Sequence, residues 1–218
     1  MTNIELIEKI QEYYTSARDS DYEDARINRG RKHSISSKTE DLIAYYLLKQ
    51  LKNIEFNFLV DYPITYRSKT EKTKSGNFKS KTIYPDIAIV QNNKIIAVID
   101  IKMDLGFNRN FDAFLKNVLN TVTDLQVIQN ATYKKIDEWN NKTRESYPIQ
   151  FSKDLKWHIV VVSDQNISQN KRIENEAFIE SICSDSPLNY YVLTRESHPN
   201  GGMPIIQENE FTRLLNNL

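Results

Sequence analysis

The sequence predicts an α/β fold for a chain of 218 residues. Two observations carry this prediction: segments with helical spacing of apolar residues alternate with short β-rich runs, and no Pro- or Gly-rich linker divides the chain. The length suits one domain with additions. Apolar residues make up 39% and charged residues 27% of the chain, which are ordinary fractions for a soluble globular protein.

Each element follows from its local pattern. Helical spacing predicts helices over residues 3–18, 38–52, 171–183 and 208–217, and a long helix that begins near Asn110, a residue suited to the N-cap position. Apolar runs rich in Val, Ile, Phe and Tyr predict strands near residues 55–64, 82–91, 95–102, 157–163 and 189–194. Residues 130–156 are polar and give no clear assignment, and 197–204 contain the Gly and Pro of a loop.

Composition excludes several classes of protein. No apolar run approaches the roughly 18 residues of a membrane span, and the acids within residues 1–14 argue against a signal peptide. The single cysteine, Cys183, excludes an internal disulfide and a multi-cysteine zinc site. The three histidines are scattered along the chain, which disfavours a histidine metal cluster. These features favour a cytoplasmic protein with no membrane partner.

Local charge is uneven although the formal net charge is zero. Residues 26–38 carry five Lys or Arg and no acid, and residues 67–81 carry six against Glu71 alone. Such segments either track a phosphate backbone or form solvated loops. The candidate nucleic-acid contacts are Arg29, Arg31, Lys32, Lys72, Lys74, Lys79 and Lys81.

One stretch combines the character of a buried hairpin with charge. Residues 82–102 read TIYPDIAIVQNNKIIAVIDIK, and the apolar runs contain Asp86 and Asp100, with Lys102 just beyond. Charged groups seldom lie fully buried without partners. Side chains alternate between the two faces of a strand. One face is therefore predicted to carry Ile96, Val98, Asp100 and Lys102.

The turn of this hairpin decides whether the two aspartates meet. A two-residue turn at 92–93 places Asp86 on the face opposite to that of Asp100. A three-residue loop at 92–94, or a β-bulge beside Pro85, places the aspartates directly opposite each other on one face. Directly opposed like charges destabilise a sheet, and a divalent cation between them would remove this repulsion.

A further acid, Glu40, lies at the start of the helix predicted over residues 38–52. It is in line with an apolar stripe formed by Ala44, Leu47, Leu48 and Leu51. This position directs Glu40 toward the sheet. The alternative interpretation is a capping box, in which Ser37 and Glu40 satisfy the first backbone N–H groups of the helix.

Pro85-Asp86, thirteen residues and then Asp100-Ile101-Lys102 resemble the signature of the PD-(D/E)xK nuclease superfamily. The predicted order over residues 38–163 (helix, three antiparallel strands, helix, strand) is similar to the core of that family, and Glu40 matches an acid common in its first helix. The glutamine-tyrosine motif of the RecB-like branch is missing. The compact size is similar to that of restriction endonucleases.

The resemblance implies a restriction-endonuclease-like core at residues 37–165, with a mixed central sheet flanked by helices. Residues 1–36 form an N-terminal helical and basic extension in this division, and residues 166–218 a C-terminal helix, strand and helix that complete the sheet. All of 1–218 is then one nuclease-like domain.

The resemblance also implies a site for Mg²⁺, with Mn²⁺ as a substitute. The metal ligands would be Asp86, Asp100 and the backbone carbonyl of Ile101, with Glu40 holding a water or a second ion. Mg²⁺ prefers oxygen ligands and lowers the pKa of a bound water. Lys102 would orient that water and offset charge on the phosphate. One ion and two ions both fit the sequence.

Three functions remain open at this point. The first is a Mg²⁺-dependent DNA endonuclease of the type II restriction kind, which is expected to be a homodimer if it cuts both strands. The second is a housekeeping, mobile-element or RNA-directed nuclease of the same fold. The third is a catalytically silent member that only binds nucleic acid or protein, and the joint presence of Asp86, Asp100 and Lys102 argues against it.

Overall fold

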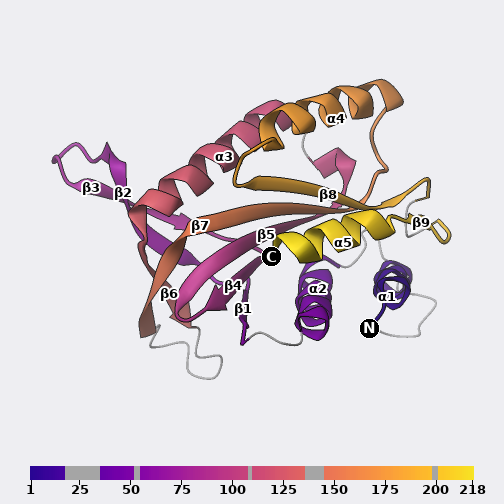
Figure 1. Cartoon of the computed structure of the whole chain (residues 1–218), viewed down its shortest axis with the longest axis horizontal. Coiled ribbons are helices and arrows are strands. Elements are labelled where there is room, and N and C mark those ends of the chain that lie inside the picture. The colour runs from indigo at the N-terminus through magenta and orange to yellow at the C-terminus, as the bar shows by residue number, and fades with distance from the viewer. Residues whose placement is uncertain (18–34, 52–54, 108–109, 136–144, 198–200) are drawn as a thin grey trace, which may run out of the picture.

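The computed structural model describes residues 1–17, 35–51, 55–107, 110–135, 145–197 and 201–218. Over these ranges the chain has an α/β structure, as the sequence predicts. One mixed sheet lies between two layers of helices (Figure 1).

The strands of the described chain all belong to one sheet. They are β1 (Asn57–Val60), β2 (Ile64–Lys72), β3 (Phe78–Ile83), β4 (Ile87–Gln91), β5 (Lys94–Asp104), β6 (Asn130–Lys135), β7 (Glu145–Ser163), β8 (Leu188–Arg195) and β9 (Ile205–Ile206). The order across the sheet is β1-β4-β5-β7-β6-β2-β3, with β8 paired to β7 and β9 to β8. β7 runs parallel to both β5 and β8, and the other neighbouring strands are antiparallel.

The helices cover both faces of this sheet. They are α1 (Asn3–Ser16), α2 (Ser36–Gln50), α3 (Phe111–Ile128), α4 (Gln169–Cys183) and α5 (Glu208–Asn217), with a short 3-10 helix η1 (Leu105–Phe107) after β5. α3 and α4 pack on one face, and α1, α2 and α5 pack on the other (Figure 1).

Two hydrophobic cores result, one on each face. Val98 of β5 and Ile159 of β7 pack beneath α3, whereas Ile99 and Ile101 of β5 pack against α2. Consecutive residues of β5 thus enter different cores, which explains why the strand is apolar on both faces. The same alternation directs Asp100 toward the α3 side of the sheet.

Several sequence predictions hold and others need correction. The helix predicted over 208–217 has those bounds, and the helix predicted over 3–18 ends at Ser16. The basic segment 67–81 is not a loop, because β2 and β3 pair across it as an antiparallel hairpin. The unassigned residues 130–156 contribute β6 and the first part of the long strand β7.

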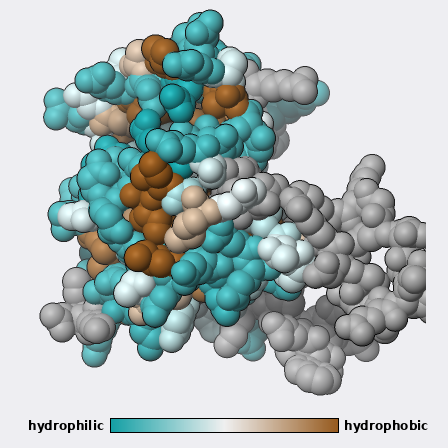
Figure 2. All heavy atoms as spheres, turned by 90° about the vertical axis from the view of Figure 1, so that its right-hand side faces the viewer, coloured by the Kyte–Doolittle hydropathy of each residue, from teal (hydrophilic) through white to brown (hydrophobic). Residues whose placement is uncertain are grey.

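Figure 2 shows the end of the molecule at the right of Figure 1, where hydrophilic side chains surround a short hydrophobic stripe. Exposed apolar side chains in the elements at this end include Ile4 of α1 and Ile205 of β9. Scattered apolar side chains are normal on a protein surface, so the stripe is not assigned as an interface. None of the helices in the described ranges combines the length and the apolar character needed to cross a membrane.

Candidate functional site

The hairpin of β4 and β5 carries the two predicted aspartates. Gln91 pairs with Lys94, so the turn consists of Asn92 and Asn93, whose φ angles are 49° and 61°. Two positive φ values are typical of the two-residue hairpin turn that asparagine tolerates. The three-residue loop considered from the sequence is therefore not formed.

A β-bulge in β5 changes the register beyond the turn. Val90 pairs with Ile95 and Ile89 pairs with Ala97, so that Ile96 is the extra residue. Ile95 packs in the core beneath α3, and Ile96 packs with Ala97 against the other core. The regular alternation predicted for this part of the strand is therefore wrong at Ile95 and Ile96, and it resumes from Ala97 onward.

The bulge brings the two aspartates into register. Ile87 pairs with Ile99, and one further step of this antiparallel register places Asp86 opposite Asp100. A two-residue turn without the bulge would have placed Asp86 opposite Ile99. The bulge was expected beside Pro85, which precedes β4. It lies instead opposite the other end of β4, next to the turn.

The Asp86 carboxylate is anchored to the end of β5. Its Oδ2 accepts a hydrogen bond of 2.5 Å from the backbone N–H of Ile101 and lies 3.8 Å from Nζ of Lys102. The backbone carbonyl of Asp86 accepts a hydrogen bond of 3.0 Å from the N–H of Asp61. Burial raises the pKa of the Asp86 carboxyl, while the Ile101 N–H and Lys102 oppose this change.

The register also bears on the Ile101 carbonyl as a ligand. Continued two residues beyond the pair Ile87–Ile99, it would place Pro85 opposite Ile101, and hydrogen-bonded residues in an antiparallel pair normally exchange two N–H···O bonds. Pro85 has no N–H, so β4 offers the Ile101 carbonyl no ladder partner at this position. The Ile101 N–H donates to the carboxylate of Asp86. This side-chain bond replaces the bond that the N–H would otherwise make to a backbone carbonyl of the neighbouring strand.

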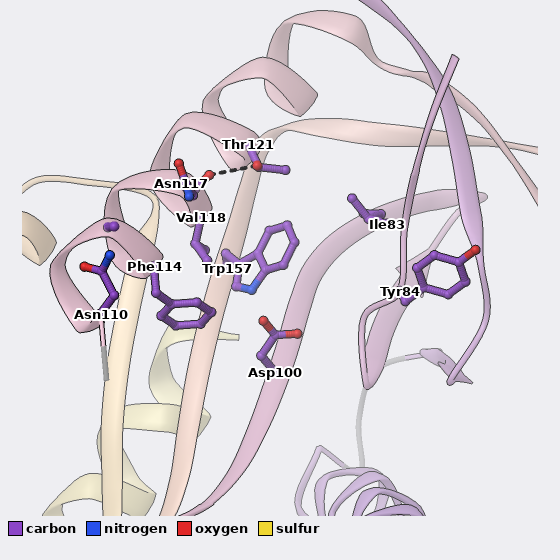
Figure 3. Close-up of a pocket in the computed structure, with 10 residues that line it drawn as sticks. Ile83, Tyr84, Asp100, Asn110, Phe114, Asn117, Val118, Thr121 and Trp157 are labelled. Atoms are coloured by element: carbon purple, nitrogen blue, oxygen red, sulfur yellow. Dashed lines mark hydrogen bonds between the residues drawn. The ribbon is translucent and has the colours of Figure 1, made fainter. Parts of the chain in front are cut away.

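Asp100 lies half-buried at the floor of a cleft between α3 and the sheet (Figure 3). Burial raises the pKa of its carboxyl to about 6, and the charge of Asp86 adds to this effect while Lys102 opposes it. The indole of Trp157 faces the carboxylate (Figure 3) and lowers its pKa.

Glu40 approaches this site from α2. The helix begins at Ser36 with Ile35 at the N-cap and no side-chain cap, so the capping box predicted for Ser37 and Glu40 is not formed. Burial raises the pKa of Glu40 to about 7, and the charges of Asp86, Asp61 and Asp41 add to this effect. The carboxylates thus repel one another. The predicted apolar stripe is correct at Ala44, Leu47 and Leu51, but Leu48 is 47% exposed.

Sequence reasoning missed Asp61 as a member of this group. Asp61 follows β1, and its charge raises the pKa of both Asp86 and Glu40. Its side chain is exposed, and its φ is 52°. The position just before Tyr62-Pro63, where a strand is interrupted, is the signal that the sequence offered.

The basic candidates differ in their surroundings. Arg29, Arg31 and Lys32 lie outside the described residues. Lys81 forms an ion pair with Glu71, and Lys79 approaches the same carboxylate at 3.5 Å. Lys72 lies over the ring of Phe78 at 5.5 Å from its centroid, and Lys74 is exposed at the turn of the hairpin. Glu71 therefore offsets part of the positive charge on β3.

The polar residues at the end of β7 have a structural role. Asp164 is buried, and its Oδ2 accepts a hydrogen bond of 2.8 Å from Arg172 of α4. Its Oδ1 accepts hydrogen bonds from the Gln165 side chain and the Glu196 N–H. Asp164 therefore ties the end of β7 to α4 and to the end of β8.

The donor set at the end of β5 was compared with the needs of Mg²⁺. Among the described residues, no three Asp, Glu, His or Cys side chains form a group that could hold a metal ion. Two carboxylates and a backbone carbonyl can still fit, because Mg²⁺ takes oxygen ligands, keeps several waters and commonly uses one or two carboxylates. Asp86, Asp100 and the Ile101 carbonyl are such a set, and a cation there would offset the repulsion among the acids.

Comparisons of the chain with protein-family models, with curated proteins and with solved structures find no match.

Proposed function

We propose that this protein is a Mg²⁺-dependent endonuclease with a restriction-endonuclease-like core, and that it hydrolyses DNA phosphodiester bonds. The observation that carries the proposal is the arrangement at the end of β5. Asp86 and Asp100 are opposed across the hairpin, and Lys102 lies 3.8 Å from the carboxylate of Asp86. The Ile101 carbonyl lies between these residues. Glu40 belongs to α2, which packs on the opposite face of the sheet from α3, and it lies near enough to Asp86 and Lys102 for their charges to shift its pKa.

The topology around the site supports the proposal. α2 precedes β1, β4 and β5, which are antiparallel neighbours, and α3 precedes β7, which is parallel to β5. This is the order of helix, three antiparallel strands, helix and strand that the resemblance implies. The β2–β3 hairpin is then an addition between the first two core strands.

Each residue of the site would have a separate role in hydrolysis. A bound Mg²⁺ would polarise the phosphate and supply an acidic water, with Asp86, Asp100 and the Ile101 carbonyl as its ligands. Lys102 would orient the attacking water and offset negative charge on the phosphate. Glu40, whose pKa is raised to about 7, can accept a proton near neutral pH as a general base.

The test is incubation of the purified protein with methylated and unmethylated plasmid DNA and with single-stranded DNA, with Mg²⁺ or with a chelator. We expect cleavage with Mg²⁺ only; discrete bands indicate site-specific cutting and smears indicate cutting without sequence preference. Lys102→Met and Asp100→Asn should abolish cleavage. Asp154→Asn is the matched control, because Asp154 is an exposed acid on β7.

Two results would contradict the proposal. Cleavage that survives Asp100→Asn at the wild-type rate would remove these residues from the site. DNA binding without cleavage under any metal condition would leave a nucleic-acid-binding protein in place of a nuclease.

A further inference from the structure

The cleft next to Asp100 is large enough to take part of a substrate. Its volume is about 480 Å³, and it lies between α3 on one side and the β3–β4 connection on the other (Figure 3). Small-molecule sites in proteins are commonly about 300–1,000 Å³, so the cleft has room for one nucleotide but not for a duplex. Its lining residues are Ile83, Tyr84, Asp100, Asn110, Ala113, Phe114, Asn117, Val118, Thr121 and Trp157.

Two aromatic rings stand on either side of Asp100. Tyr84, between β3 and Pro85, is 69% exposed, and Phe114 projects from α3 (Figure 3). Water makes only weak contacts with the faces of an exposed tyrosine ring, whereas aromatic rings stack readily on nucleobases. The exposed ring of Tyr84 therefore offers a flat stacking surface, and Phe114, which also packs against the core beneath α3, lines the opposite side of the cleft.

The floor and the α3 wall of the cleft are polar at a few positions. Trp157 is buried, and its indole faces the Asp100 carboxylate at the floor of the cleft (Figure 3). It holds the pKa of that carboxyl lower than burial alone would set it. Asn117 and Thr121 lie one turn apart on α3 and line the cleft. The Thr121 hydroxyl donates to the backbone carbonyl of Asn117 at 2.8 Å and keeps only acceptor capacity, and Asn117 adds its side-chain amide. The cleft thus combines aromatic surface with donors and acceptors, as a nucleobase requires.

We infer that this cleft binds one unpaired nucleotide, with its base beside Tyr84 and Phe114 and its phosphate at the metal ion that Asp86 and Asp100 would hold. The inference rests on the proposed nuclease function and specifies its substrate class: single-stranded or locally unpaired nucleic acid. A base within a duplex would have to leave the stack to enter, which costs a few kcal/mol. An unpaired base enters without that cost, so single strands are favoured over duplexes of the same sequence.

Binding is measured without cleavage, by fluorescence anisotropy of a labelled oligonucleotide with the Lys102→Met protein in Mg²⁺. The single strand should bind more tightly than the duplex. Tyr84→Ala should weaken single-strand binding about 5- to 150-fold, the range for loss of one base–aromatic stack. Tyr45→Ala is the matched control, because Tyr45 is an exposed tyrosine on α2 and should leave binding unchanged.

A second readout places the base. The chain has two tryptophans, so a Trp139→Phe background leaves Trp157 as the sole indole. A mononucleotide that occupies the cleft should quench its fluorescence, and Tyr84→Ala should reduce this quenching.

The outcomes separate the two proposals. Equal affinity for single strand and duplex, or a Tyr84→Ala protein that binds like the wild type, overturns the cleft assignment even if Mg²⁺-dependent cleavage is found. Selective single-strand binding that depends on Tyr84, without cleavage in Mg²⁺, overturns the nuclease proposal and leaves the cleft assignment in place.

Discussion

Asp100→Asn should raise the free energy of unfolding of the metal-free protein at pH 8. The pKa of Asp100 is raised from 3.8 to about 6, chiefly by burial. Ionised Asp100 is therefore less favourable in the folded chain than in the unfolded chain. The difference between the two pKa values corresponds to about 3 kcal/mol at pH 8, where the carboxyl is ionised in both states. Asparagine keeps the shape of the side chain and removes that cost.

The gain should depend on pH in a defined direction. A raised carboxyl pKa costs stability above the folded-state value, and this cost declines as the pH falls from about 6 toward 3.8. About half of the gain should therefore remain at pH 5. Urea denaturation in chelator at pH 8 and pH 5 measures both values, with Asp154→Asn as the control.

Mg²⁺ should stabilise the wild-type protein more than the Asp100→Asn variant, which is the reverse of the difference expected in chelator. A ligand that binds only the folded state stabilises it, by about 2.7 kcal/mol at 100 times its dissociation constant. Wild-type protein should gain stability on addition of Mg²⁺, and Asp100→Asn should gain much less. A variant that is destabilised in chelator at pH 8, or that differs equally from the wild type at both pH values, would refute the account of a buried, repelled carboxylate.

Three further predictions concern other parts of the molecule. Neutralising Lys72, Lys74 and Lys79 should weaken binding to all DNA sequences alike and flatten the salt dependence of the binding constant by up to about 0.9 log unit per lost contact. Anisotropy titrations at several salt concentrations measure the slope, and an unchanged slope would mean that the hairpin is merely solvated. His158→Phe should remove a pH-dependent loss of stability, because burial lowers the pKa of His158 from 6.5 to about 3. Stability is then full above pH 6.5, and the wild type should lose about 2 kcal/mol relative to the variant between pH 7 and pH 5 in urea titrations; parallel pH profiles would contradict this. Asp164→Ala should cost roughly 2 kcal/mol, because it removes the acceptor of the hydrogen bonds from Arg172, Gln165 and the Glu196 N–H, and should lower Tm by about 4–8 °C in thermal unfolding. A fall in Tm below about 2 °C would show that the Arg172 contact adds little.

The elements predicted best from the sequence are those that bury one face, because burial of one face gives a regular spacing of apolar residues. α5 and the apolar end of β7 are of this kind, since each buries a regular pattern against the sheet. The β2–β3 hairpin was missed because β3 faces solvent along most of its length and is rich in Lys and Ser. A ribbon that projects from the core is held largely by backbone pairing, which leaves little apolar alternation in the sequence.

The acidic residues were identifiable, but their geometry was not. Asp86, Asp100 and Lys102 stand out as charges in apolar runs, whereas the bulge at Ile96 has no signal of its own. Residues 95–99 are apolar on both faces, so a shift by one residue exchanges one buried side chain for another. The capping box at Ser37 failed for a comparable reason, because a start at Ser36 is equally compatible with the local residues.

The central position of β5 bears on when the chain acquires its site during synthesis. β5 is covered along one edge by β4, which precedes it, and along the other by β7, whose paired residues emerge much later from the ribosome. Parallel pairing needs the intervening crossover to be complete. A nascent chain that ends before β7 thus contains all the proposed ligands but not the sheet that positions them. The proposed site would therefore form only after β7 has left the ribosome and paired with β5.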